Sequence, residues 1–465
     1  MSGNRAGAID RATKHFDDGG FFADLARRVA WRTVSQDPAF ADQLTGYLQQ
    51  ELTPVLERMG YACAIHANPK PPYGPFLIAR RIEDASLPTV LTYGHGDVVR
   101  GLDEQWREGL SPWILKLEGE RLYGRGTADN KGQHSINLAA LQAVIAERGS
   151  LGFNSIVLIE TGEETGSPGL HEICRQQKDA LKADVLIGSD GPRLRPERPT
   201  IFTGTRGALN FELTLDMREG GHHSGNWGGL LVNPGIVLAH AIAAIADRRG
   251  AIQVPEWRPT SLTPAVQRVL AECVVDGGEG APAIDPEWGE PGLTPAERVF
   301  GWNSFEVLAF KTGNPENPVN AIPPRATAWC QLRFVVGTDP DDILPALRRH
   351  LDQHGYNDVS IKPSREVFMR ATRLDPESAL MQWAAKSVAS TTGQAPNVLP
   401  NLGGSLPNDA FTDVLGMPTL WVPHSYASCS QHAPNEHMLA PVAREGLQVM
   451  AGLFWDVGAG GVPRG

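Results

Sequence analysis

Residues 89–97, Thr-Val-Leu-Thr-Tyr-Gly-His-Gly-Asp, form a short apolar run that is followed at once by small and polar residues. Three later runs have the same near-continuous apolar character: 155–159 (Ser-Ile-Val-Leu-Ile), 184–187 (Asp-Val-Leu-Ile) and 419–422 (Thr-Leu-Trp-Val). Such runs are typical of strands buried on both faces. Helical spacing of apolar residues lies between them, most clearly over 131–147. The pattern therefore predicts an α/β fold with a mostly parallel sheet and crossover helices.

The flanking and middle parts of the chain have other patterns. From about Phe21 to Met59, apolar residues at helical spacing predict two helices before the sheet. Between about 206 and 364 the predicted order is β-α-β-β-α-β. An irregular Pro/Gly-rich segment at 249–295 interrupts it. The predicted elements are strand 209–215, helix 234–246, strands 304–310 and 327–335, helix 339–354 and strand 359–361. This order is ferredoxin-like. We therefore predict a compact α+β domain at 206–367 that is inserted into a first domain split into 1–205 and 368–465.

Composition excludes several classes of protein. The 465 residues are 41% apolar and 20% charged, as in ordinary globular proteins. The formal net charge of −11 has the wrong sign for a protein that binds nucleic acid. The five cysteines are far apart and form no Cys-x-x-Cys pair, which argues against a disulfide framework or a cysteine zinc site. Without a signal-peptide or membrane-spanning pattern, we expect a soluble cytoplasmic protein with no membrane partner.

Polar residues follow three of the predicted strands directly. They include His95 and Asp97 after the first, Glu163 and Glu164 after the second, and Asp190 after the third. Ligands of an open parallel sheet bind beyond the carboxyl ends of its strands, so we expect these side chains to meet in one crevice. Each alone also has an ordinary interpretation, since a histidine after a strand is commonly structural and paired glutamates commonly begin a helix at the surface.

Asp129 lies where the helix predicted at 131–147 begins, and an aspartate there can simply be an N-cap. Together with His95, Glu164 and Asp190 it gives imidazole and carboxylate donors without thiolate, the set typical of catalytic zinc, manganese or cobalt. Two cations that share a carboxylate would use so many donors. The glycine-rich segment around Asp129 has no nucleotide-binding fingerprint, and the chain has no Gly-x-Ser-x-Gly motif of serine hydrolases.

A set of motifs along the chain resembles the M20 metallopeptidase family, which includes aminoacylases, carnosine-type dipeptidases, glutamate carboxypeptidases and succinyl-diaminopimelate desuccinylases. Any one motif is weak, but their order and spacing are specific. They are Gly94-His95-Gly96-Asp97, residues 124–132 (Gly-Arg-Gly-Thr-Ala-Asp-Asn-Lys-Gly), residues 163–167 (Glu-Glu-Thr-Gly-Ser), Ser189-Asp190, residues 204–207 (Gly-Thr-Arg-Gly), His223-Ser224-Gly225, and Gly403-Gly404-Ser405 with a later His432.

The resemblance implies a role for each matched position in the catalytic domain. Asp129 would bridge two cations, one completed by His95 and Asp190 and the other by Glu164 and His432. Glu163 would be the general base, and Asp97 would support His95. The peptide bond between Asp129 and Asn130 would be cis. His424 and His437 compete with His432, which is preferred because residues 433–436 after it are a predicted helix start.

The resemblance also assigns residues to substrate binding. His223, with His222 as its bystander, would reach across a homodimer formed through the inserted domain and polarise the scissile carbonyl. The other candidates are Asn320, Arg333, Gly404 and Ser405. The guanidinium group of an arginine such as Arg333 can bind a substrate carboxylate through two parallel hydrogen bonds. The resemblance further implies that the split domain 1–205 and 368–465 is the catalytic domain and that the inserted domain 206–367 is its lid and dimerisation domain. Hinges near Arg206 and Val367 would let this lid close over the catalytic domain.

The implied activity is hydrolysis of an amide or peptide bond in a small carboxylate-bearing substrate such as a dipeptide. A water that bridges the two cations, zinc or alternatively manganese or cobalt, would lose its proton to Glu163. The alternative activity is removal of an acyl group from an N-acyl amino acid. A catalytically silent metal-binding protein of the same fold is a third interpretation, which the presence of Glu163 and all five candidate ligands opposes.

Overall fold

The computed structural model describes residues 3–276, 282–364 and 368–463. Its larger sheet has the strand order β1-β2-β6-β3-β7-β17-β9-β16. The strands are β1 (Ala62–His66), β2 (Phe76–Arg81), β3 (Thr89–His95), β6 (Asn154–Glu160), β7 (Val185–Gly188), β9 (Thr200–Phe202), β16 (Asn397–Leu399) and β17 (Thr419–Trp421). The central strands β6, β3, β7 and β17 are parallel. This confirms the predicted α/β fold. The strands β1 and β2 were not predicted, and they extend one edge of the sheet in antiparallel pairing.

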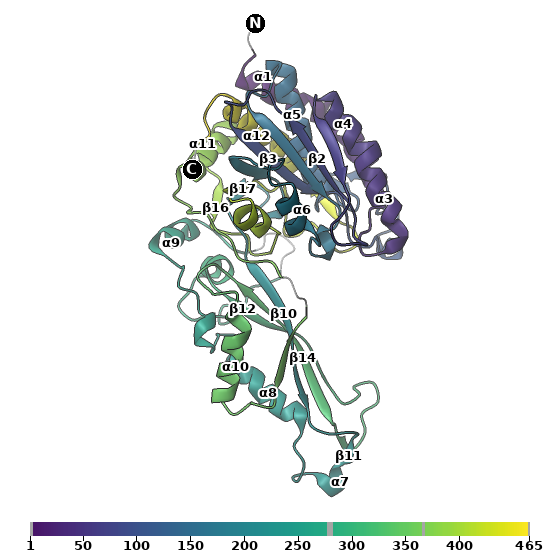
Figure 1. Ribbon diagram of the computed structural model, residues 1–465, viewed down its shortest axis with the longest axis vertical. Helices are drawn as coiled ribbons and strands as arrows, with labels where there is room; N and C mark the ends of the chain where they lie inside the picture. The colour runs from purple at the N-terminus through teal and green to yellow at the C-terminus, as the bar shows by residue number, and fades with distance from the viewer. Residues whose placement is uncertain (1–2, 277–281, 365–367, 464–465) are drawn as a thin grey trace.

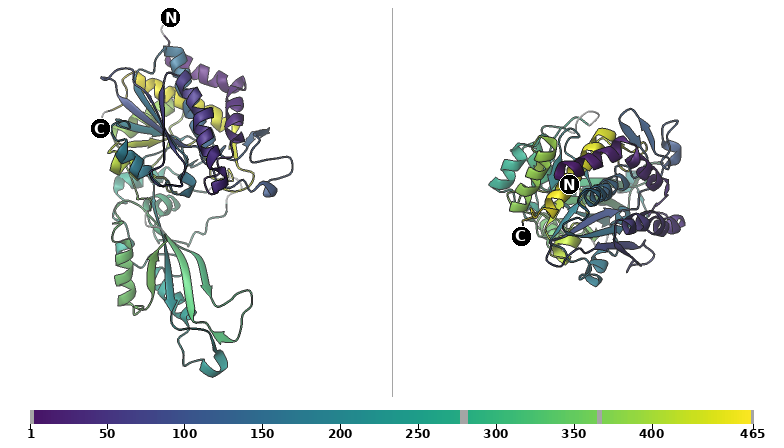
Figure 2. Two further views of the ribbon diagram at one scale, coloured as in Figure 1. Left: turned by 45° about the vertical axis from the view of Figure 1, so that its right-hand side comes forward. Right: turned by 90° about the horizontal axis from the view of Figure 1, so that it is seen from above.

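Helices cover both faces of this sheet (Figures 1 and 2). Alternate residues of β6 belong to different cores: Val157 and Ile159 pack into one, and Ile156 and Leu158 into the other, as the two-residue period of a strand requires. The helices of this part are α1 (Arg5–Asp17), α2 (Gly20–Ala30), α3 (Ala41–Gly46), α4 (Thr53–Arg58), α5 (Lys131–Arg148), α6 (Leu170–Gln176), α11 (Ala379–Thr392) and α12 (Ala440–Gly458).

A second sheet, with the order β12-β14-β10-β15, has its own apolar core. Its strands are β10 (Gly207–Asp216), β12 (Ser304–Thr312), β14 (Arg325–Phe334) and β15 (Ser360–Pro363), and its helices are α8 (Pro234–Ile245) and α10 (Ile343–Gln353). The chain order is the predicted β-α-β-β-α-β. Figure 1 shows this part extending below the larger sheet, with β11 (His222–His223), β13 (Ala321–Ile322) and α7 (Ser224–Trp227) toward its far end.

Two expectations about local structure were wrong. The segment 249–295 is not wholly irregular, because it contains α9 (Pro264–Ala271), whose Val266 and Leu270 join a core of the larger sheet. Residues 433–436 do not start a helix. They lead into β19 (His437–Leu439), and α12 begins only at Ala440, with Pro441 in its first turn where proline is tolerated.

Short strands complete the described structure. β19 joins β5 (Arg121–Tyr123) and β4 (Lys116–Glu118) in a three-stranded sheet, and β18 (Ser425–Tyr426) pairs with β8 (Pro192–Arg193). The predicted hinge at Val367 lies outside the described residues, and the domain limits stay a prediction. Across the three described ranges, no helix is long and apolar enough to cross a membrane.

Candidate metal centre

The polar residues predicted to meet do so at the carboxyl ends of the central strands. His95 ends β3, Asp190 comes two residues after β7, and Glu163 and Glu164 lie in a 3₁₀ turn after β6. Asp129 lies just before α5. The parallel pairing of β3 with both β6 and β7 is what brings these loops to one edge of the sheet.

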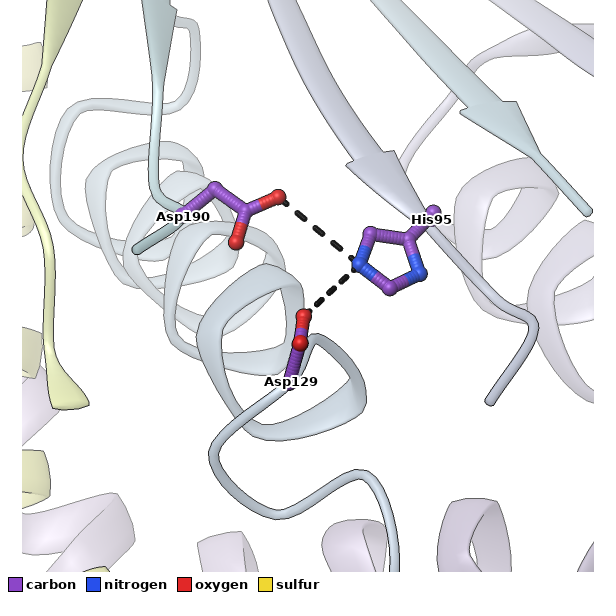
Figure 3. Close-up of side chains that lie close together, drawn as sticks. All are labelled: His95, Asp129 and Asp190. Atoms are coloured by element: carbon purple, nitrogen blue, oxygen red, sulfur yellow. Dashed lines mark hydrogen bonds and ion pairs between the residues drawn. The ribbon is translucent and has the colours of Figure 1, made fainter. Parts of the chain in front are cut away.

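His95, Asp129 and Asp190 form one group of potential ligands (Figure 3). His95 Nε2 lies 2.9 Å from Asp129 Oδ1 and 3.7 Å from Asp190 Oδ2. All three residues are buried. One imidazole nitrogen and two carboxylate oxygens therefore converge in a space that excludes bulk water.

Asp129, Glu164 and His432 form a second group within the described residues. His432 Nε2 lies 2.9 Å from Asp129 Oδ2 and 3.0 Å from Glu164 Oε2. The His432 side chain is 53% exposed, whereas that of Glu164 is 3% exposed. Asp129 thus offers one oxygen to each group, which is the geometry expected of a shared carboxylate.

The electrostatics of these residues fit bound cations. Burial, followed by the charge of Asp129, raises the pKa of Glu164 and of Asp190. Burial and the neighbouring carboxylates likewise raise the pKa of Glu163. Asp190 Oδ2 is buried without a hydrogen-bond partner among the described residues. Divalent cations would offset this crowding of negative charge, and the imidazole and oxygen donors suit zinc, manganese or cobalt.

Asp97 holds three site residues in place. Its Oδ1 accepts a hydrogen bond from the Glu163 backbone N–H and its Oδ2 one from the Glu164 backbone N–H, both at 3.1 Å. His95 Nδ1 lies 3.1 Å from the Asp97 carbonyl oxygen and 3.4 Å from Oδ1. A proton on Nδ1 directed at Asp97 leaves Nε2 available as a ligand. The peptide bond between Asp129 and Asn130 is cis, as predicted.

The two competing histidines are not in either group of potential ligands. His424 is fully buried, and neither of its ring nitrogens has a hydrogen-bond partner among the described residues. His437 Nε2 lies 2.6 Å from the Tyr426 hydroxyl. The geometry therefore favours His432 as the late ligand.

The candidate substrate-binding residues fall into two places. Arg333 at the end of β14 donates to Ser405 Oγ at 3.2 Å, and the Gly404 carbonyl accepts from the Arg206 backbone N–H at 3.2 Å. His223 and Asn320 instead lie in and beside the β11–β13 pair, at the end of the second sheet remote from the larger one (Figure 1). Within one chain the structure does not bring His223 to the metal centre.

Three residues beside the centre were missed by the sequence analysis. Gln431 Nε2 donates to Asp129 Oδ2 at 2.5 Å, so it competes for an oxygen that belongs to the second group. Arg125 and Glu436 form a buried ion pair of 2.8 Å next to the Asp129 loop. The only sequence signal was their position, since each lies close to a predicted ligand or within a motif.

The comparisons with known proteins agree with this geometry. Residues 91–456 match the profile of peptidase family M20/M25/M40. The cysteinylglycine-S-conjugate dipeptidase of Corynebacterium striatum is 26% identical over 69% of this chain and 70% of that protein. The human Beta-Ala-His dipeptidase is 34% identical over 40% of this chain and 36% of that protein.

Among solved structures, the M20 family metallo-carboxypeptidase Sso-CP2 of Sulfolobus solfataricus has the same fold. Its TM-score is 0.79 at 24% sequence identity, and the match covers 94% of this chain and 99% of that one. The profile match spans most of the chain and includes every residue of the two potential ligand groups. The chain belongs to peptidase family M20/M25/M40.

Proposed function

We propose that the protein is a metal-dependent peptidase that hydrolyses dipeptides or similarly small amides bearing a carboxylate. The observation that carries the proposal is the position of Asp129, whose two oxygens each lie 2.9 Å from a different histidine, His95 and His432. The dipeptidase names of the Corynebacterium striatum and human relatives support a dipeptide substrate.

Two divalent cations fit the residues described above. His95, Asp129 and Asp190 would hold one, and Asp129, Glu164 and His432 the other. Cations held in this way would lower the pKa of a bound water and would polarise the carbonyl group of the substrate. Zinc is the metal we propose, with manganese and cobalt also compatible with these donors.

Glu163 is the proposed general base. Its backbone N–H is held by Asp97, and burial together with the charges of Glu164, Asp129 and Asp190 raises the pKa of its carboxyl group. A carboxylate with a raised pKa is suited to accept a proton from the attacking water and to return it to the leaving amine. Glu163 is therefore kept free for proton transfer while its neighbour Glu164 serves as a ligand.

Arg333 is the proposed clamp for the substrate carboxylate. It lies on β14 of the second sheet and donates to Ser405, which belongs to the chain segment following that sheet. Burial lowers the pKa of Arg333, but the guanidinium remains a cation at neutral pH. Closure of the second sheet's domain over the metal centre, with Arg206 near one hinge, would bring Arg333 onto the substrate and exclude water.

The position of His223 supports a homodimer. This residue is remote from the metal centre of its own chain, so it can polarise a scissile carbonyl only in a partner subunit. β12 forms one edge of the second sheet, and its Val307, Leu308 and Phe310 are exposed. An exposed apolar edge strand favours pairing with another chain. We further propose a cytoplasmic location, which the five free thiols favour.

The test is hydrolysis by protein that has been freed of metal with a chelator and then given zinc. The substrates are a panel of dipeptides and a panel of N-acyl amino acids. We expect turnover of dipeptides that is absent before zinc is added. Faster turnover of the N-acyl amino acids would replace the proposal with the deacylase alternative, and inertness on both panels would support a silent binding protein.

A further inference from the structure

The carboxylate of Glu436 holds the loop that carries Asp129. Glu436 is 1% exposed, and its Oε1 accepts hydrogen bonds from three backbone N–H groups of that loop. The donors are Gly126 at 3.0 Å, Ala128 at 3.0 Å and Asp129 at 3.1 Å. Converging N–H groups form a concave site for an anion, here filled by the protein's own carboxylate.

Arg125 balances the charge of this carboxylate. Its Nη1 donates to Glu436 Oε2 at 2.8 Å, and its guanidinium carbon lies 5.7 Å from the centre of the Trp106 ring. The side chain of Arg125 is fully buried. A buried carboxylate is stable only when it is paired and hydrogen-bonded, and both conditions are met here.

Glu436 also connects this loop with the segment that carries His432. The two residues are four positions apart, and the Glu436 carbonyl oxygen accepts from the Gly124 backbone N–H at 3.1 Å. Immediately beyond, β19 pairs with β5, so that His437 lies opposite Tyr123. The loops that supply Asp129 and His432 are therefore held together by one residue that is not itself in either ligand group.

We propose that Glu436 is a positioning residue that sets both metal-binding groups at once, because its Oε1 fixes the backbone of the one aspartate they share. This inference rests on the proposed function, which assigns a cation to each group. Loss of the three N–H contacts would release the Asp129 loop and displace an oxygen from both groups. Loss of His432, in contrast, removes a ligand from the second group alone.

Two double variants isolate the Oε1 contacts from the ion pair. Arg125→Met with Glu436→Gln removes both charges but keeps an amide oxygen that can accept the three N–H groups. Arg125→Met with Glu436→Met removes the same charges and the acceptor, at similar side-chain length. His432→Ala is the comparison for loss of one group.

Zinc binding to each metal-free protein is measured by titration calorimetry, together with the urea midpoint of unfolding. We expect the Gln variant to keep two zinc sites with affinities close to wild type. We expect the Met variant to weaken both sites by about 10- to 100-fold, the usual effect of losing a residue that orients a metal ligand. His432→Ala should weaken one site. A Met variant that binds zinc like the Gln variant overturns the inference.

Asp456→Asn controls for general loss of stability. Asp456 accepts hydrogen bonds from Arg5 Nε at 2.9 Å and Ser387 Oγ at 2.6 Å, among residues outside the metal centre. We expect it to lower the unfolding midpoint while leaving zinc affinity unchanged. Equal loss of zinc affinity in Asp456→Asn and in the Met variant would reduce Glu436 to a structural role and overturn the inference.

Hydrogen exchange on the wild-type protein tests the inference even if the Met variant does not fold. The amides of Gly126, Ala128 and Asp129 should exchange slowly in the metal-free protein, because Glu436 holds them before any zinc binds. Rapid exchange that slows only after zinc is added overturns the inference. A wild-type protein that binds no zinc contradicts the proposed function itself, which separates the two failures.

Discussion

Asp129 Oδ2 lies 2.9 Å from His432 Nε2, although 303 residues separate the two along the chain. Asp129 comes from a loop before α5, and His432 from a loop before β19. The contact completes the second group of potential ligands, so the metal centre depends on the end of the chain folding back onto its first third.

Glu163→Gln should keep two bound zinc ions and lower kcat by about 10²- to 10⁴-fold, the usual contribution of a general base. The amide has nearly the same shape but accepts no proton. The measurements are metal content and steady-state kinetics on a dipeptide. Glu57→Gln, an exposed acid on α4, is the control and should match wild type. A near-normal kcat in Glu163→Gln would remove Glu163 from the mechanism.

Asp97→Asn should lower both kcat and zinc affinity, each by about 10- to 100-fold. Both Asp97 oxygens accept backbone N–H groups, from Glu163 and Glu164, and an amide can offer only one oxygen in their place. The variant would therefore disturb the base and a ligand together. Kinetics and zinc titration on the same preparation check this. Unchanged zinc affinity would show that Asp97 does not hold the Glu164 turn in place.

Arg333→Met should raise the KM of dipeptides with a free carboxylate by about 10- to 100-fold, the value of a hydrogen bond to a charged group. The same variant should leave dipeptide amides, which lack the carboxylate, unaffected relative to wild type. Comparing the two substrates in both proteins separates carboxylate binding from general damage. An equal loss on both substrates would contradict the clamp.

Leu308→Glu with Phe310→Glu should convert a dimer into a folded monomer with much reduced kcat. The change places two charges on the exposed edge strand β12, and monomers lose the partner's His223. Sedimentation velocity gives the assembly state and circular dichroism checks folding. A monomer as active as the wild-type dimer would refute the role of His223 across the interface.

The His171–Asp409 pair should make stability depend on pH. The hydrogen bond from His171 Nε2 to Asp409 Oδ2, 3.1 Å long, raises the pKa of His171 above its usual 6.5. The stabilisation is therefore complete below about pH 6.5 and is lost as pH rises through the raised value. Solvent screening limits it to about 0.5–1 kcal/mol.

Urea unfolding of wild type and His171→Gln at pH 5.5 and pH 9 measures this effect. The gap between the two proteins in free energy of unfolding should be larger at the lower pH. A gap that is equal at both values would show that the charged form of His171 has no part in stability.

The apolar runs of the sequence predicted the central strands, and the resemblance of its motifs predicted the candidate residues of both ligand groups. Buried parallel strands are near-continuous apolar runs, and their polar carboxyl ends are recognisable without knowledge of distant contacts. The sequence did not predict α1, since its buried residues are only Ala8 and Ala12, which give too weak an apolar period. It also gave no sign that 437–439 form a strand, because that strand exists only through pairing with β5.

Contacts made after folding separate the late histidines from one another and explain the part played by Glu436. The sequence favoured His432 over His424 and His437 through a helix start at 433–436 that the structure does not contain. What distinguishes the three histidines is which ring nitrogen reaches Asp129 after the chain has folded. A glutamate that accepts three backbone N–H groups has no sequence signature, because its partners are main-chain atoms present in almost every residue. Local residue pattern and motif resemblance therefore predicted the candidate ligands, and long-range packing brought both groups to Asp129 and placed Glu436 against its loop.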